Sequence, residues 1–436
     1  MRPCQKNKRG GQTMKKLLAF IMAAVMLLAL TACGKKNGGN NDKPNGEGLS
    51  GDVTFMVIDS FNSDDNALQA ATDAFMKANP NVHVTIEYVA STSIQEKFTT
   101  AALAGSGPDV IALDSAGWAV DAAAAGLLKP LDNELKPIAD QFFEGPLSSG
   151  IYNGSCYSVP WYMNNEGLYY NKTILAAAGV ENPPATWDEL VDAIAKVKAA
   201  GYEGITMPYF FPSYYMYPFF YQAGCPIVDT TGAKPVSALM TDEGKAAWKY
   251  LCDLATTYDA YPESIKDATS WDSTYAPFMQ GEVAFLFCGD WAYWSVEFNS
   301  EVDYGIAPMP AGKEAATLLG GYTLSINSNT KNYDAAWAYI QWLTAAEQSN
   351  VLESYGRISA RIDTDTTELV KNYPHEATFI AQRESTMSRP SIINQSELDE
   401  MVSNAYKEVF LGTKDADTAL ADLDAKVSTF LHGLYS

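Results

Sequence analysis

The sequence predicts an α/β protein built from two domains, and three observations lead to this prediction. The first part of the body alternates short apolar, β-branched runs with stretches of helical periodicity. That alternation is typical of parallel β-α-β units. The chain has 436 residues, which is too long for one compact core. Its hydrophobic content of 47% fits a well-packed globular protein.

The N-terminal segment, residues 1–32, has the order of features of a secretory signal peptide. Lys15 and Lys16 precede an apolar run over residues 17–32, which is shorter than the roughly 20 residues of a membrane span. Residues 30–33 (LTAC) resemble the lipobox of bacterial lipoproteins, in which the thiol, here that of Cys33, receives a diacylglycerol. We expect translation to start at Met14, so that residues 1–13, with Cys4, form an extension without a structural role.

Residues 33–50 are expected to be the lipidated Cys33 and a flexible tether, because they are rich in Gly and Asn and nearly free of apolar side chains. Two acyl chains hold a protein stably on a membrane. The predicted location is therefore the extracellular face of the cell membrane, reached through the lipid anchor.

The strongly negative net charge of the chain limits the kinds of partner that it can bind. The net charge is −22, and loss of residues 1–32, with six basic and no acidic residues, makes it −28. Such a surface repels phosphate backbones, so nucleic acid is not an expected partner. It also repels anionic headgroups, so contact with the membrane is expected through the lipid alone.

The expected elements follow in chain order. Strands are predicted at residues 53–58, 82–86 and 109–113, with helices at 68–79 and 94–103 between them. In parallel sheets, ligands bind beyond the carboxyl ends of the strands, so the loops after Ile58 and Leu113 are candidate site loops. Later helices are predicted at residues 186–200, 241–258, 333–343 and 417–431, with Thr186 and Thr241 as N-caps.

No catalytic, metal-binding or cofactor motif stands out. The three histidines are far apart and outside any HExxH pattern, and phosphate-loop, GxSxG and EF-hand patterns are missing from the sequence. No catalytic residue, metal or cofactor is therefore predicted. The body cysteines form no CxxC pair, and buried free thiols are favoured over disulfides, whose pairing stays open: Cys156, Cys225, Cys252 and Cys288.

Two clusters of aromatic residues are the features of the sequence that indicate a binding site. Residues 209–221 (YFFPSYYMYPFFY) hold nine aromatic side chains, of which Phe219 and Phe220 are expected in a core and Tyr214 and Tyr215 at a cleft. A second cluster comprises Trp271, Tyr275, Trp291, Tyr293 and Trp294. Aromatic faces stack on the C–H faces of sugars, and Tyr hydroxyls can bond sugar hydroxyls. Together with export, the clusters favour a carbohydrate site.

Several motifs then occur in an order that resembles the extracellular solute-binding proteins (family 1) of carbohydrate ABC importers, the family that includes maltodextrin-binding protein. The most specific is PPATWDEL at residues 183–190. The others are GPDVI (107–111), GLLKPL (126–131), YSVP (157–160), LYYNK (168–172), FMQGEVA (278–284), GDWA (289–292), YGIAPMP (304–310) and Gly320-Gly321. The resemblance covers residues 52–431.

The resemblance implies a type 2 periplasmic-binding-protein (Venus-flytrap) fold, in which two α/β lobes hold the ligand between them. The N-lobe would comprise residues 51–162 and 309–355, and the C-lobe residues 163–308 and 356–436. Binding would be a hinge closure, and the closed form would deliver the ligand to the permease subunits of an ABC importer. The protein is expected to act as a monomer and not as an enzyme.

Site residues follow from the resemblance position by position. The loop after the first strand places Asn62 at the sugar, and the loop after PDVI places Asp114 and Trp118 there. Asn164 follows the first crossing, and Trp291 is the stacking residue of the GxW motif. The remaining expected ligand-binding residues are Tyr214, Trp271, Tyr322 and Arg357.

Two departures make maltose itself doubtful: Pro212 and the Glu397-Leu398-Asp399 segment replace an acidic residue and a tryptophan of maltodextrin binders. Two alternatives remain open at this stage. One is an exported glycosidase, which needs only two carboxylates at the right separation. The other keeps the fold and binds a peptide, a polyamine or a sugar phosphate.

Overall fold

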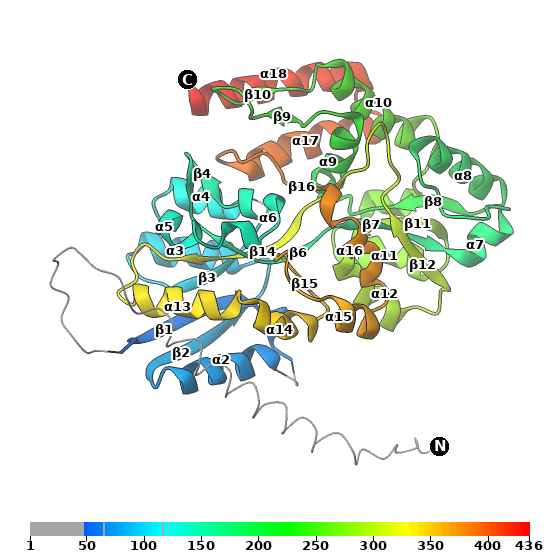
Figure 1. Ribbon diagram of the computed structural model, residues 1–436. Helices are drawn as coiled ribbons and strands as arrows, with labels where there is room; N and C mark the ends of the chain where they lie inside the picture. The colour runs from blue at the N-terminus through cyan, green and yellow to red at the C-terminus, as the bar shows by residue number, and fades with distance from the viewer. Residues whose placement is uncertain (1–47, 64–65, 116) are drawn as a thin grey trace, which may run out of the picture. The chain divides into compact units, whose positions relative to one another are not determined.

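The computed structural model describes residues 48–63, 66–115 and 117–436, and residues Gly48–Ser436 form one compact unit (Figure 1). The predicted signal peptide, Cys33 and most of the tether lie outside the described residues. Among the described helices, none is both long and apolar enough to cross a membrane.

A six-stranded sheet organises the first half of this unit, in the order β15-β6-β14-β3-β1-β2. Strand β1 runs parallel to both β2 and β3, which confirms the predicted β-α-β units. Strand β14 returns from much later in the chain and pairs antiparallel with β3 and β6. The strands are β1 (Ser50–Ile58), β2 (Asn81–Val89), β3 (Val110–Asp114), β6 (Val159–Asn164), β14 (Gly320–Ile326) and β15 (Ile358–Ser359).

The crossover helices match the periodicity of the sequence. Helix α2 (Ala67–Ala78) starts where the Asn66 side chain accepts a hydrogen bond from the Gln69 N–H, and it buries Leu68 and Phe75. Helix α3 (Ile94–Leu103) has the predicted bounds, and α13 (Tyr333–Leu343) packs on β1 and β14. Trp337 and Trp342 of α13 are partly buried against the first core.

The first strand is longer than predicted. It begins at Ser50, which pairs with Asn81, whereas the sequence indicated a start at Val53 and a tether up to residue 50. The reason is that residues 50–52 form ladder hydrogen bonds with β2 although they have no apolar pattern.

A four-stranded sheet organises the second half, in the order β12-β7-β11-β8. Its central strand β11 is buried along its whole length, as a continuous apolar run allows. The strands are β7 (Glu166–Asn171), β8 (Glu203–Thr206), β11 (Val283–Gly289) and β12 (Tyr304–Pro308).

The helices of the second half include the two with predicted N-caps. The Thr186 and Thr241 hydroxyls accept hydrogen bonds from the Glu189 and Gly244 N–H groups. In Figure 1, α17 and α18 lie beside α9 and α10. The helices are α7 (Lys172–Ala177), α8 (Trp187–Ala199), α9 (Pro212–Ala223), α10 (Asp242–Thr256), α11 (Trp271–Met279), α12 (Tyr293–Asn299), α17 (Gln395–Phe410) and α18 (Ala416–Tyr435).

Two separate hydrophobic cores correspond to the two sheets. Tyr162 belongs to the first core and its neighbour Met163 to the second, so the cores divide within β6. Farther along, Leu319 packs in the second core and Tyr322 in the first. This arrangement agrees with a fold of two lobes, while the lobe boundaries given above stay a prediction.

Shorter elements complete the described chain, and Cys156, Cys225, Cys252 and Cys288 are free thiols, as favoured above. The short helices are α4 (Trp118–Ala124), α5 (Asp132–Leu135), α6 (Glu144–Ser148), α14 (Ser349–Glu353), α15 (Thr367–Asn372) and α16 (Glu376–Ala381). The short strands are β4 (Ile151–Tyr152), β5 (Ser155–Cys156), β9 (Val228–Asp229), β10 (Val236–Ser237), β13 (Thr317–Leu318) and β16 (Thr386–Met387).

Candidate functional site

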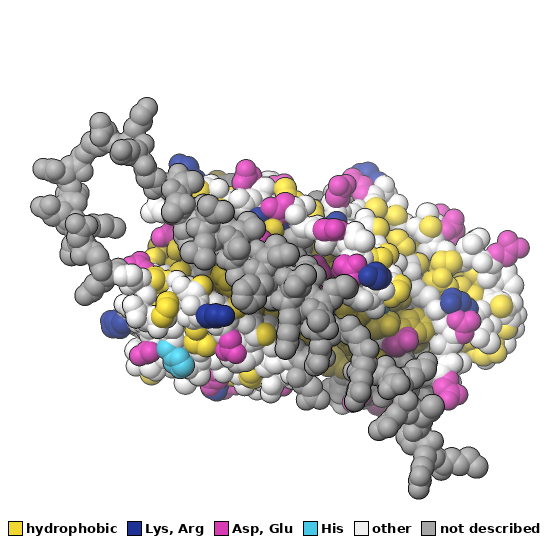
Figure 2. Space-filling model, turned by 60° about the horizontal axis from the view of Figure 1, so that its bottom comes forward, with side chains coloured by type: hydrophobic (Ala, Val, Ile, Leu, Met, Phe, Trp, Pro, Cys, Tyr) yellow, Lys and Arg dark blue, Asp and Glu magenta, His cyan; other side chains and the backbone are white. Residues whose placement is uncertain are grey.

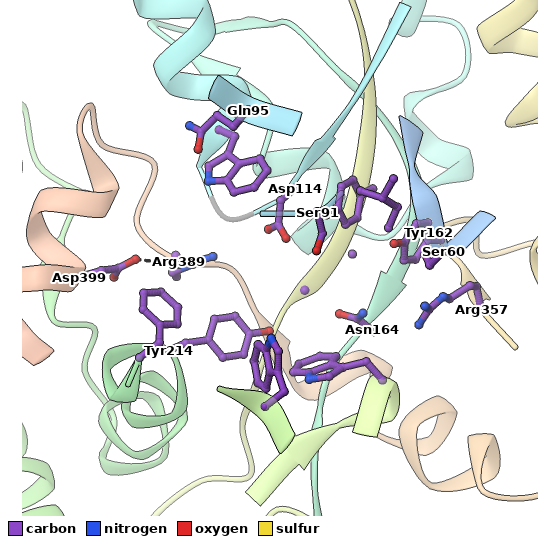
Figure 3. Close-up of a pocket in the computed structure, with 18 of the residues that line it drawn as sticks. Ser60, Ser91, Gln95, Asp114, Tyr162, Asn164, Tyr214, Arg357, Arg389 and Asp399 are labelled. Atoms are coloured by element: carbon purple, nitrogen blue, oxygen red, sulfur yellow. Dashed lines mark hydrogen bonds and ion pairs between the residues drawn. The ribbon is translucent and has the colours of Figure 1, made fainter. Parts of the chain in front are cut away.

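A pocket of about 560 Å³ is lined by residues of both cores (Figure 3). This volume falls in the usual range of small-molecule sites. Its polar and charged lining residues are Asp59, Ser60, Ser91, Gln95, Asp114, Asn164, Arg357, Arg389, Ser396 and Asp399.

Residues at the ends of the parallel strands of the first sheet form one wall of the pocket. Strands β1, β2 and β3 run in the same direction, so their carboxyl ends meet at one edge. The segments that follow these ends contribute Asp59 and Ser60, then Ser91 and Gln95, and Asp114 closes β3. The candidate loops after Ile58 and Leu113 therefore do reach the pocket.

Aromatic side chains from the second half form the opposite wall. Tyr214 of α9 meets Trp291 edge to face, with ring centroids 6.0 Å apart and planes at 68°. Trp271 at the start of α11 meets Trp291 in the same way, at 6.4 Å and 73°. Trp271 is 40% exposed and Phe211 37%. The wall thus has a buried centre at Tyr214 and an apolar rim that is open to a ligand.

The position of Trp291 depends on Gly289 at the end of β11. A Cβ atom on this glycine would lie 2.0 Å from Cζ3 of the Trp291 indole, so any side chain would displace the ring. The indole Nε1 is buried and has no hydrogen-bond partner within the described chain.

The Gly320-Gly321 pair opens the middle of the pocket. Gly320 is paired with Asn164 across β14 and β6, and a Cβ here would lie 2.1 Å from Asn164 Oδ1. Gly321 has φ +109°, in the region that favours glycine. The next residue, Tyr322, stacks on Tyr162 at 5.5 Å and 20°. Asn164 Oδ1 is buried and lacks a hydrogen-bond partner among the described residues, so it can accept one from a ligand.

Burial sets the protonation of the tyrosines. Loss of hydration raises the pKa of Tyr162, Tyr214 and Tyr322 above the usual value for tyrosine. Their hydroxyls are therefore neutral at physiological pH and can both donate and accept hydrogen bonds.

A buried ion pair lies at one end of the pocket. Arg389 Nη1 donates to Asp399 Oδ2 at 2.8 Å, which Figure 3 marks with a dashed line. Asp399 Oδ1 also accepts from the Tyr217 hydroxyl at 2.9 Å and from Gln395 Nε2 at 3.1 Å. The Arg389 guanidinium lies over the Tyr214 ring, with Cζ 5.2 Å from its centroid. These contacts stabilise the charged pair in the wall.

A second group of charges lies behind Arg357. Its Nη1 is 3.8 Å from Oδ1 of Asp290, and Glu376 Oε1 is 3.0 Å from His375 Nε2. Burial, together with repulsion from Glu376, raises the pKa of Asp290 to about 8, against the attraction of Arg357. Burial also raises the pKa of Glu376 to about 8 and lowers that of His375 to about 4. These shifts favour the protonated form of both carboxyl groups and the neutral form of the imidazole.

Eight of the nine expected ligand-binding residues line this one pocket; Asn62 is the exception. Asn62 is exposed, whereas Asp59 and Ser60 of the same loop line the pocket. Of the second aromatic cluster, Trp271 and Trp291 line it, and Tyr275, Tyr293 and Trp294 do not. Whether the lining residues bind a ligand stays a prediction.

Other lining residues were missed by the sequence reasoning. Ser91 and Gln95 follow the carboxyl end of β2, so the strand-end rule applied to the first and third strands would have found them. Asp399 was noted only as part of a departure from maltodextrin binders, and Arg389, in the segment before α17, carries no local signal. Arg389 is thus a second basic lining residue beside the expected Arg357.

A second groove of about 770 Å³ lies elsewhere on the unit. Its lining includes Arg383, Ser148 and Ser388, and it shares Arg389 with the first pocket. Ser388 Oγ donates to the Gly145 carbonyl at 2.8 Å. Of the aromatic pairs around Trp291, none reaches this groove.

Comparison with known proteins agrees with this architecture. The family model of the bacterial extracellular solute-binding proteins matches residues 59–350. The diacetylchitobiose binding protein DasA of Streptomyces coelicolor is 28% identical over 345 residues, which cover 75% of this chain and 77% of DasA.

A maltooligosaccharide ABC transporter solute-binding lipoprotein of Streptococcus pneumoniae is 24% identical over 434 residues, covering 94% of this chain and 95% of that protein. Among solved structures, the GacH receptor of Streptomyces glaucescens, determined unliganded and with acarbose, superposes with a TM-score of 0.75 at 27% identity. That match covers 88% of this chain and 99% of GacH.

Proposed function

Because the chain belongs to the bacterial extracellular solute-binding protein family, we propose that its pocket captures a sugar or short oligosaccharide for an ABC importer. The observation that carries this proposal is the aromatic wall of Trp291, Tyr214 and Trp271, which stands opposite hydrogen-bonding groups such as Asn164 Oδ1. Aromatic faces with nearby polar groups suit the apolar and hydroxylated sides of a sugar ring.

The relatives support the same ligand class. DasA is named for diacetylchitobiose, the pneumococcal lipoprotein for maltooligosaccharides, and GacH was solved with acarbose. These proteins are binding proteins and not enzymes, and we propose the same role here. The sugar is expected not to be maltose, because this chain departs from the maltodextrin binders at Pro212 and at Asp399.

Capture is proposed to occur by closure of the two lobes, residues 51–162 with 309–355 against residues 163–308 with 356–436. A ligand that touches both walls stabilises the closed form, because its contacts are complete only there. The permease subunits of an importer would recognise that form. The protein is proposed to act as a monomer.

Attachment through Cys33 is proposed to keep the protein on the extracellular face of the membrane. On the visible part of the described surface in Figure 2, acidic side chains are dispersed among apolar and a few basic ones. Since the net charge is also strongly negative, the lipid and not the protein surface is expected to make the membrane contact.

The experiment that tests this function is a thermal-unfolding screen with mono-, di- and oligosaccharides. A ligand that binds only the folded form adds about 2.7 kcal/mol to the free energy of unfolding when its concentration is a hundred times Kd. This added stability raises the midpoint temperature of unfolding. We expect a few structurally related sugars to raise the midpoint in a saturable way. A broad panel without any shift, together with absence of binding heat, contradicts the proposal.

A further inference from the structure

Arg357 differs from the other well-buried arginines in its hydrogen bonds. Arg361 donates to both carboxylate oxygens of Asp363, at 2.8 and 2.7 Å, and Arg389 donates to Asp399 at 2.8 Å. Within the described residues, the guanidinium of Arg357 has no hydrogen-bond partner, and its Nε is fully buried. A guanidinium offers five N–H donors; the one at Nε is buried here, and leaving it unfilled costs free energy.

The Arg357 side chain reaches the pocket. The Arg357 side chain is 13% exposed and lines the cavity. In Figure 3 its guanidinium points toward the centre of the pocket, where Asn164 lies. The Tyr162 ring supports it from one side, with Cζ 5.6 Å from the ring centroid. The structure therefore holds this group in place before any ligand is present.

The acids behind Arg357 do not cancel its charge. Asp290 and Glu376 are each 1% exposed, and the Asp290 contact of 3.8 Å is longer than a hydrogen bond. Burial raises the pKa of both carboxyl groups to about 8, which favours their neutral form and weakens their pairing with Arg357. The Arg357 guanidinium itself stays protonated.

Two of the other carboxylates of the pocket, those of Asp399 and Asp114, lie toward the Arg389 end. Asp399 is paired with Arg389 at the opposite end of the pocket, and in Figure 3 Asp114 lies on the Arg389 side of Asn164. Asp59 is exposed, so solvent screens its charge. An anionic ligand group at the Arg357 end would therefore lie closer to the guanidinium than to Asp399 or Asp114.

We infer that the ligand of this pocket is an acidic sugar whose carboxylate is bound by Arg357. The inference rests on the proposed function, since it assigns a class to the sugar captured there. A planar guanidinium matches a carboxylate with two parallel N–H···O bonds. Sulfate and phosphate esters of sugars are also negatively charged. Comparing them with uronates shows whether Arg357 selects a carboxylate or any anionic group.

The test is calorimetric titration of the purified protein with matched disaccharides that differ in one group. Glucuronate- and galacturonate-containing disaccharides are compared with their neutral glucose and galactose counterparts and with sulfate and phosphate esters of the same sugars. A hydrogen-bonded charge pair predicts at least about tenfold tighter binding of the uronate member than of the neutral one. Equal or tighter binding of every neutral member overturns the inference, and tighter binding of an ester overturns its assignment to a carboxylate.

The variants Arg357→Gln and Arg357→Lys locate the effect. R357Q is expected to bind both members of a pair equally, and R357K to keep part of the preference as a point charge. Arg383→Gln, in the second groove, is the matched control and should keep the full preference. A preference that survives R357Q in a folded protein overturns the assignment to Arg357.

If R357Q does not fold, the comparison of uronate and neutral disaccharides on the wild-type protein still tests the inference. If neutral sugars bind and uronates do not, only the inference fails, and the proposed function stands. If no sugar of any kind binds, both fail.

Discussion

Trp291 and Tyr214 come from segments 77 positions apart in the chain and meet edge to face in the pocket wall, at 6.0 Å between ring centroids. Both rings have close neighbours in the wall. The Trp291 indole packs against Gly289, which has no side chain, and the Arg389 guanidinium lies over the Tyr214 ring. Side chains that are fixed before binding lose little entropy when a ligand arrives. This pair is therefore the rigid part of the proposed sugar site.

Replacement of Trp291 by alanine is expected to weaken sugar binding about ten- to hundredfold, because central aromatic residues dominate binding free energies. Trp291 is only partly buried, so the unliganded fold should unfold at nearly the same temperature. Titration calorimetry measures the affinity. Phe298→Ala is the control, since this side chain is 70% exposed and does not line the pocket. Unchanged affinity in W291A would remove Trp291 from the site.

Gly320→Ala tests the close approach in the middle of the pocket. The new Cβ would lie 2.1 Å from Asn164 Oδ1 and 2.8 Å from the Tyr214 hydroxyl, so one or both must move. We expect loss of most sugar affinity, and about 1–3 kcal/mol of destabilisation from overpacking. Gly433→Ala is the control, because nothing lies within 4 Å of the added atom. Normal affinity and stability in G320A would contradict the described geometry.

Asp290→Asn tests the buried acid behind Arg357. Because the folded pKa of Asp290, about 8, is above its usual value, the folded state holds a proton that the unfolded state releases. The contribution of Asp290 to stability is thus present at low pH and is lost as pH rises toward 8. Asn resembles the protonated form at every pH.

Denaturant unfolding of both proteins between pH 5 and pH 9 measures this difference. D290N is expected to gain stability relative to the wild type as pH rises, and to level off above pH 8. Ser273→Ala, in an exposed capping box distant in sequence from this cluster, should show a difference that does not vary with pH. The same constant difference in D290N would show that Asp290 has an ordinary pKa.

Cys33→Ser tests the lipid anchor. Without the thiol no diacylglycerol can be added, so we expect the protein to move from the membrane fraction to the medium. Fractionation and labelling with a palmitate analogue in a bacterial host measure this. Cys4→Ser should leave both unchanged, because residues 1–13 are expected to have no role. A membrane-bound, labelled C33S protein would refute lipidation at Cys33.

Much of the fold was predictable because its local signals are strong. Helix α3 has its predicted bounds, and the caps at Thr186 and Thr241 lie where a hydroxyl precedes acidic residues. The start of β1 was not predictable, since Ser50 joins the sheet through backbone pairing with Asn81 and has no apolar pattern. Pairing partners distant in sequence leave no local trace.

The site was predictable where residues follow strand ends or stand in family motifs, as Asp114 and Trp291 do. Asp399 was not expected as a lining residue, because its place depends on the packing of α17 against α9, and Arg389, in the segment before α17, carries no local signal. That the Arg357 side chain has no hydrogen-bond partner among the described residues was equally invisible in the sequence. It becomes apparent only when the distance to Asp290 and the burial of that carboxyl are known.

The most direct test of the central claim is a crystal structure of the protein with a sugar that raises its unfolding temperature. The ligand is predicted to lie against Trp291 and Tyr214, within hydrogen-bond distance of Asn164 and with an acidic group at Arg357. A sugar bound in the second groove beside Arg383, or anywhere away from Trp291, would contradict the account.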